Sequence, residues 1–262
     1  SEALFKFASA CLGHRKGGVA MAAVGACAGF GAICGSSLAT AATMGKVALP
    51  ELRRLGYSGS LSTGALAAGG TLGILIPPSV ILIIYSILTE QNIAKMFLAA
   101  LVPGILAALG YIVTIAIFVR LVPGSGRAQQ RITMAGRMCY FRNIWHVLLI
   151  FTFMLSGIYL GWLTPTEGAA VGAAGTGLVA MFQKNFDLSA LLDVIQSTAI
   201  TSGMIFLVLL GAEFFNSFIA LTQLPVLLAS FLSEGGFSPL LVGAALFVLS
   251  LLLGCLVDSW AV

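Results

Sequence analysis

The sequence contains GSSLATAAT at residues 35–43 and GGTLGILIPPS at residues 69–79, and both stretches lie in strongly apolar surroundings. Gly, Ser, Thr and Pro weaken a helix and free backbone carbonyl and amide groups from intrahelical hydrogen bonds. Within a bilayer, such groups are tolerated only where they line a cavity or face other protein. Paired interruptions of this kind are typical of the substrate and ion sites of secondary transporters.

The composition is that of an integral membrane protein. The chain has 262 residues, of which 59% are hydrophobic and 8% are charged, whereas soluble domains carry about 25% charged residues. At about 20 apolar residues for each span, the length allows roughly seven to nine passes or half-passes. No polar stretch is long enough to build a large water-facing domain. The net charge of +4 comes from basic residues in short loops and does not indicate binding to nucleic acid.

The first interruption predicts a helical hairpin. The apolar run at residues 17–33 and the segment from Ser36-Ser37 to Pro50 are each too short to cross a bilayer core of about 30 Å. We therefore expect a re-entrant hairpin over about residues 17–54, with its tip at Ser36-Ser37. The motif Gly25-x-x-x-Gly29 inside the hairpin is expected to serve helix packing.

The second interruption predicts a broken helix over about residues 61–88. Three glycines at positions 69, 70 and 73 are expected to break it once, and Pro77-Pro78 to break it again. A kinked structural helix is the alternative interpretation. A kink accounts for one proline, but not for glycines and prolines together in a single span.

The loop at residues 123–143 sets the orientation of the chain. It contains Arg127, Arg131, Arg137 and Arg142 and no acidic residue, so the positive-inside rule places it in the cytoplasm. Counting spans back along the chain puts the basic pairs at residues 15–16 and 53–54 on the same side, so the hairpin would open to the cytoplasm.

The predicted organisation is two repeats of opposite orientation, at residues 1–122 and 144–262. Within them we expect apolar membrane segments at 93–122, 144–163, 169–182, 198–221 and 239–254. A short interfacial helix is expected at 187–196 and an external amphipathic connection at 224–236. The last segment would begin a second hairpin with its tip near Asp258. The predicted fold class is an all-α polytopic membrane protein with inverted repeats, re-entrant helical hairpins and broken helices.

The first hairpin tip offers chemistry for both a cation and an anion. Hydroxyl and carbonyl oxygens are neutral ligands that suit a hard cation such as sodium. Two helix N-termini meeting there would also favour a carboxylate. Packing through small residues is the alternative for residues 35–43. We favour a binding site because the two interruptions occur together.

Acidic residues in apolar segments are functional candidates. Asp258 falls where the second tip is expected, so we predict a role there, whereas the role of Glu213 stays open. The string Thr164-Pro165-Thr166-Glu167 fits a capping box that begins a helix. The motifs H-E-x-x-H, G-x-S-x-G and the P-loop are absent from the sequence, so it does not predict an enzyme.

Four strings together resemble the large membrane (M) subunit of tripartite ATP-independent periplasmic (TRAP) transporters. They are GSSLATAAT at 35–43, LPE at 49–51, GGTLGILIPPS at 69–79 and YLGWLTPTE at 159–167. The resemblance runs across nearly the whole chain, and LGCLVDS at 253–259 is similar to the start of the family's second hairpin tip.

The resemblance implies a sodium-driven importer with an elevator mechanism, of the ion-transporter-superfamily type, in the bacterial inner membrane. A periplasmic binding protein (P type) would deliver a small organic acid, such as a C4-dicarboxylate or sialic acid. A small membrane subunit (Q type) would brace the scaffold. The implied sodium ligands are Ser36, Ser37, Gly70, Thr71, Gly73 and Asp258, and the substrate would be bordered by Gly35, Thr40, Thr43, Pro77 and Pro78.

The chain departs from this family in length, because it looks like a piece that lacks the initial helices and the second broken span. The second sodium site would then be incomplete in this chain alone. Three other functions stay open: a stand-alone sodium–dicarboxylate carrier, a non-transporting membrane scaffold, and an intramembrane enzyme using Asp258 or Glu213, for which no nucleophile–base pair is visible.

Overall fold

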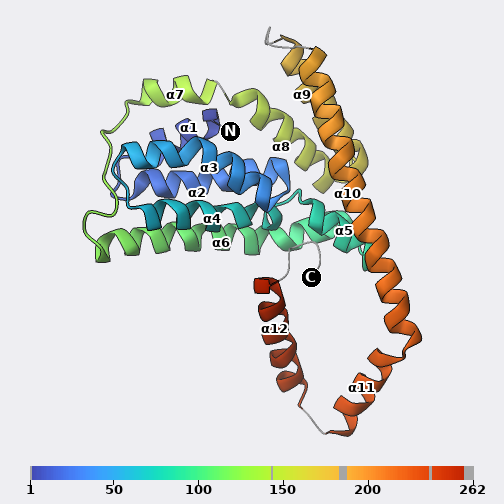
Figure 1. The fold of residues 1–262 in the computed structure, drawn as a ribbon. Helices are drawn as coiled ribbons and strands as arrows, with labels where there is room; N and C mark the ends of the chain where they lie inside the picture. Colours follow the sequence, from blue (N-terminus) through green and yellow to red (C-terminus); the bar gives the residue numbers. More distant parts are fainter. Residues whose placement is uncertain (1, 143, 183–187, 236–237, 257–262) are drawn as a thin grey trace. The chain divides into compact units, whose positions relative to one another are not determined.

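The computed structural model describes residues 2–142, 144–182, 188–235 and 238–256, and every regular element in them is an α-helix (Figure 1). The predicted all-α class is therefore confirmed. The chain divides between Gln183 and Lys184 into two compact units. Each unit is described by itself, and the inverted relation between two repeats stays a prediction.

The first unit holds nine helices within the described residues. They are α1 (Glu2–Leu12), α2 (Gly18–Cys34), α3 (Ser37–Arg54), α4 (Gly59–Leu75), α5 (Val80–Leu88), α6 (Ile93–Leu121), α7 (Met134–Arg142), α8 (Trp145–Tyr159) and α9 (Pro165–Phe182). The second unit holds α10 (Leu188–Leu221), α11 (Leu224–Glu234) and α12 (Pro239–Leu256).

Helices α2 and α3 form the predicted hairpin. Gly35 ends α2 with a φ of 65°, in the left-handed region, and its N–H donates to the Gly31 carbonyl. Ser36 then caps α3, because its Oγ accepts from the Ala39 N–H at 3.4 Å. The 17 residues of α2 extend about 26 Å, less than a bilayer core of about 30 Å. The tip is confirmed, and its entry into the membrane stays a prediction.

The predicted break at Pro77-Pro78 is confirmed, whereas the predicted break at the glycines is wrong. Helices α4 and α5 meet at an angle of 42°, with the break at residues 76–79. Residues 69–73, however, continue α4 as regular helix. The physical reason is packing, because these glycines lie where α4 touches α2 and α3 closely. Neighbouring helices thus hold in place residues whose own helix propensity is low.

The core of the first unit lies between the hairpin, α4 and α6, which run side by side (Figure 1). Its buried side chains include Val19, Val24, Cys27, Met44, Ala48, Leu52, Leu61, Ala65, Leu72, Ile115 and Val119, with Phe5 of α1. Gly29 faces Leu4 of α1, but a Cβ on Gly25 would meet nothing within 4 Å. The expectation that Gly25 serves packing is therefore wrong within the described residues.

Two segments differ from the predicted secondary structure. Residues 134–142 form α7 inside the region expected to be a loop, and residues 188–221 form one helix where a break near Ser197 was expected. In α10 the hydroxyls bond within the helix, since Thr198 donates to the Val194 carbonyl at 2.7 Å and Thr201 donates to the Ser197 carbonyl at 2.8 Å. Such back-bonding lets hydroxyl residues continue a helix.

The capping box at the start of α9 is confirmed. Thr164 Oγ1 accepts from the Glu167 N–H at 3.3 Å, and Glu167 Oε2 accepts from the Thr164 N–H at 2.7 Å. The two side chains thus satisfy donors that the first turn leaves unpaired.

Among the described residues, two helices are long and apolar enough to cross a bilayer, over Ile93–Leu121 and Ser189–Leu221. The bent pairs α4–α5 and α7–α8 raise the number to four if each is one span. These findings, with the apolar helices α2 and α12, fit a multi-pass membrane protein.

Tyr57 fastens the segment after α6 to the hairpin. Its side chain is 5% exposed, and its hydroxyl accepts from the Val19 N–H at 3.2 Å and donates to the Arg127 carbonyl at 2.7 Å. Burial raises the pKa of Tyr57, which keeps the hydroxyl protonated as a donor. The Ser58 N–H donates to the Ser125 carbonyl and the Gln129 N–H to the Gly13 carbonyl. The segment at residues 125–129 is therefore tied to the turns before α2 and before α4.

We predict that Tyr57→Phe lowers the stability of the protein by roughly 1–3 kcal/mol, because it leaves a buried N–H and a carbonyl without their partner. Tyr85→Phe makes the same chemical change at a side chain that is 54% exposed, and it should have little effect. Thermal unfolding in detergent compares the two variants. Equal shifts of the unfolding midpoint would contradict this role of Tyr57.

Candidate functional site

The hairpin tip lies directly against α4. A Cβ built on Gly73 would come 2.8 Å from Thr40 Oγ1 and 2.9 Å from the Ser36 carbonyl oxygen. One turn earlier, a Cβ on Gly70 would lie 2.7 Å from Ala41 Cβ and 3.3 Å from the Ser37 carbonyl oxygen. Only hydrogen fits at these two positions, so the glycines bring α4 within contact of the tip's carbonyl oxygens.

The tip also touches the break between α4 and α5. A Cβ on Gly35 would lie 3.2 Å from the Val80 nitrogen and 3.4 Å from the Pro78 carbonyl oxygen. Pro77 and Ser79 are fully buried beside it. The two interruptions that the sequence separates by more than thirty residues therefore meet in space.

Four helix ends converge at this meeting point. Helices α2 and α4 end there with their carbonyl groups, and α3 and α5 begin there with their N–H groups. Helix C-termini favour cations and helix N-termini favour anions. Partial negative charge and partial positive charge therefore lie next to one another at this point.

The structure brings most of the predicted site residues together. Those that meet at the tip and the break are Gly35, Ser36, Ser37, Thr40, Gly70, Gly73, Pro77 and Pro78. Thr40 is fully buried, and its hydroxyl donates to the Ser36 carbonyl at 2.7 Å. That hydrogen bond occupies the Thr40 donor, so its contact with a substrate stays a prediction.

Thr71 and Thr43 lie elsewhere on their helices. The Thr71 side chain is exposed, and its Oγ1 donates to the Ala68 carbonyl at 2.7 Å and lies 3.2 Å from the Tyr111 hydroxyl of α6. Thr43 is half-buried, one turn beyond Thr40. The hydroxyl of Thr71 therefore faces α6 rather than the tip.

Asp258 lies outside the described residues. Glu213 is exposed on α10 within its own unit.

Ser79 is a residue that the sequence reasoning missed. Its side chain is 0% exposed and its Oγ has no hydrogen-bond partner in the described part of the chain. It is the N-cap residue of α5, but its side chain makes no capping bond. A buried hydroxyl without a partner is uncommon and calls for an explanation such as a bound ion or water. The available signal was its place as the one hydroxyl residue directly after Pro77-Pro78.

A helical hairpin packed against a broken helix, in a chain of apolar helices, defines a class of membrane transporter. The family model of the DctM component of tripartite ATP-independent periplasmic transporters matches residues 1–262. The chain belongs to this family. The resemblance drawn from the four strings is thereby confirmed.

Curated relatives carry the same assignment. The chain is 38% identical over 239 residues to the C4-dicarboxylate TRAP transporter large permease protein DctM of Pseudomonas aeruginosa, covering 90% of this chain and 55% of that protein. It is 31% identical over 264 residues to the sialic acid TRAP transporter permease protein SiaT of Haemophilus influenzae, covering 100% of this chain and 42% of that protein. The chain thus spans about half the length of the curated relatives that it matches.

We predict that Gly73→Ala destabilises the protein by roughly 1–3 kcal/mol, because the new methyl group would force the tip and α4 apart. Gly64→Ala is the matched control on the same helix, since its Cβ would meet nothing within 4 Å. This control should be neutral or stabilise by up to about 1 kcal/mol, through its better helix propensity. Thermal unfolding distinguishes the two, and a loss of stability in both variants would refute close packing at Gly73.

Proposed function

We propose that this chain forms the ion- and substrate-binding part of a sodium-driven importer of small organic carboxylates. The observation that carries the proposal is the meeting of the hairpin tip with the α4–α5 break, where two carbonyl ends and two N–H ends of helices converge. Family membership and the names of relatives that handle C4-dicarboxylates and sialic acid support the substrate class.

The proposed sodium site uses oxygens of Ser36, Ser37, Gly70 and Gly73. The unpartnered Oγ of Ser79 is a further candidate ligand on the break. Neutral carbonyl and hydroxyl oxygens are the donors that a hard cation takes. Thr71 joins this set only if its hydroxyl leaves Tyr111. Asp258 stays a proposed ligand at the second tip.

The substrate carboxylate is proposed to sit at the N-termini of α3 and α5, beside Gly35 and Pro77-Pro78. Backbone N–H groups of a helix's first turn have no intrahelical acceptor, so they can donate to a carboxylate. Sodium at the adjacent carbonyl ends would add positive charge next to the same carboxylate. Sodium binding and substrate binding would then strengthen each other.

The remainder of the proposal concerns the complete transporter. The first unit would move as part of an elevator against a scaffold in the bacterial inner membrane. A periplasmic binding protein would deliver the acid, and a small membrane subunit would support the scaffold. These partners are proposed from family membership.

The test is uptake of radiolabelled C4-dicarboxylates and sialic acid into proteoliposomes that hold the complete transporter, under an inward sodium gradient. We expect uptake to require both sodium and the cognate binding protein. Uptake without the binding protein would favour the stand-alone carrier. No uptake, together with no stabilisation of the purified protein by sodium, would favour the scaffold.

Within this assay, we predict that Ser37→Ala and Ser79→Ala each raise the sodium concentration for half-maximal uptake by about tenfold, as expected for the loss of one oxygen ligand. Thr71→Val should change it less, because the Thr71 hydroxyl is bonded in the α4–α6 interface. Thr63→Val is the control for hydroxyl loss on α4, since Thr63 is exposed and bonds only within its helix. Unchanged sodium dependence in both serine variants would exclude the hydroxyls of Ser37 and Ser79 as sodium ligands.

A further inference from the structure

Helix α7 has one apolar face that is largely exposed. Met134 is 77% exposed, Met138 is 65% exposed and Phe141 is 40% exposed. At 100° for each residue, the three fall within about 60° of one another around the helix axis. Exposed apolar side chains aligned in this way mark an interaction surface.

Two arginines flank this apolar face. On the same helical geometry, Arg137 and Arg142 lie about 40° beyond its two edges, one on each side. Apolar residues bordered by Arg are typical of a helix lying in the membrane interface, because the long side chains reach the headgroups while the stripe enters the acyl region. Helix α7 also packs on α1 of the bundle, where the rings of Phe141 and Phe7 lie 5.8 Å apart at one edge of this face.

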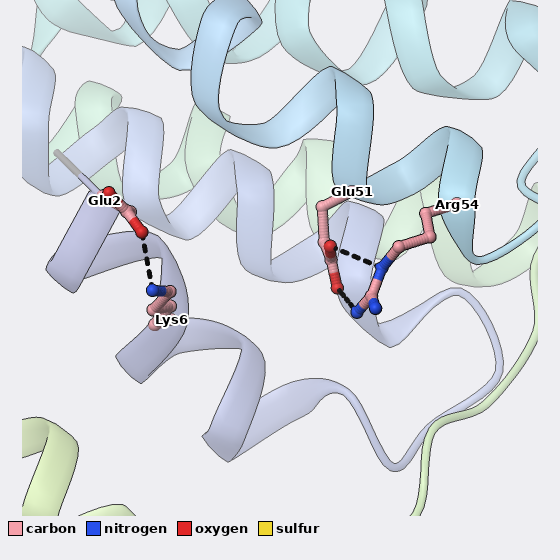
Figure 2. Close-up of polar contacts among 4 residues, drawn as sticks. All are labelled: Glu2, Lys6, Glu51 and Arg54. Atoms are coloured by element: carbon pink, nitrogen blue, oxygen red, sulfur yellow. Dashed lines mark hydrogen bonds and ion pairs between the residues drawn. The ribbon is translucent and has the colours of Figure 1, made fainter.

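The surface is positively charged and lacks nearby counterions. Residues 123–143 contain four arginines and no acid. Glu2 and Glu51, the acids on the adjoining α1 and α3, are already paired with Lys6 and Arg54 at 2.6 Å each (Figure 2). An anionic ligand would supply counterions to this surface.

The position of α7 also fits an interface. Its axis makes an angle of 59° with that of α8. Helix α8 begins with Trp145, which is 47% exposed, and tryptophan is enriched at the level of the headgroups. A helix turned away from the next span, at the level of an exposed tryptophan, is suited to lie along the membrane surface rather than across it.

We propose that α7 is an interfacial helix that binds anionic phospholipid, with Met134, Met138 and Phe141 in the acyl region and Arg137 and Arg142 on the phosphate groups. Charge complementarity selects an anionic lipid over a zwitterionic one, since each arginine near an anionic surface strengthens binding. This surface is distinct from the hairpin tip, so its test is independent of transport.

The test places a bimane label on Met138→Cys in the complete, otherwise cysteine-free permease, reconstituted in vesicles of phosphatidylcholine and phosphatidylglycerol. Brominated phosphatidylglycerol and brominated phosphatidylcholine quench the label in parallel samples. We expect both lipids to reach the label, with stronger quenching by the anionic lipid. That preference should fall roughly fivefold for each of Arg137→Gln and Arg142→Gln, and it should weaken in high salt.

Arg53→Gln is the matched control, because Arg53 is exposed at the end of α3 without an apolar stripe beside it. It should leave the preference unchanged. A label that neither lipid quenches would mean that protein covers this face, and would overturn the proposal. Equal quenching by the two lipids, or an equal loss of preference in Arg53→Gln, would also overturn it.

Discussion

The close approach of α4 to the hairpin is the interaction on which the first unit depends. A Cβ on Gly31 would come 2.5 Å from the Gly73 Cα, and a Cβ on Gly69 would come 3.0 Å from Cys27 Sγ. In a bilayer, helices are held together mainly by van der Waals contact and interhelical hydrogen bonds, since lipid is as apolar as the side chains. Small residues on α2 and α4 therefore supply both the packing energy and the position of the tip.

This packing also bears on the two interpretations of residues 35–43, helix packing and a binding site, which the sequence presents as alternatives. The glycines of α4 serve helix packing, and by doing so they place the Ser36 and Ser37 carbonyl oxygens against the broken helix. Packing and the proposed binding are thus compatible uses of the same residues. The break itself needs only Pro77-Pro78, where the ring and the missing N–H interrupt the ladder of helix hydrogen bonds.

The sequence was sufficient to predict features with a local cause. The hairpin turn follows from Gly35 and Ser36, the start of α9 from Thr164 and Glu167, and the bend from two prolines. Features that depend on contacts with neighbouring helices were not predictable. The glycines of α4 form regular helix because α2 and α3 support them, and the orientation of Thr71 toward Tyr111 is set by α6. The burial of Ser79 likewise comes from the hairpin folding over it.

The attachment around Tyr57 has a mechanical consequence for the tip. Val19 and the start of α4 are tied to residues 125–129 at one end of the bundle, whereas Gly35 and the α4–α5 break lie at the other end. Sliding of the hairpin against α6 is therefore opposed at the tied end, and relative motion becomes a pivot about it. With α2 as a lever arm of about 26 Å, a rotation of about 5° displaces the tip by about 2 Å. A side chain far from the hairpin tip thus limits how far the oxygens of the tip can move.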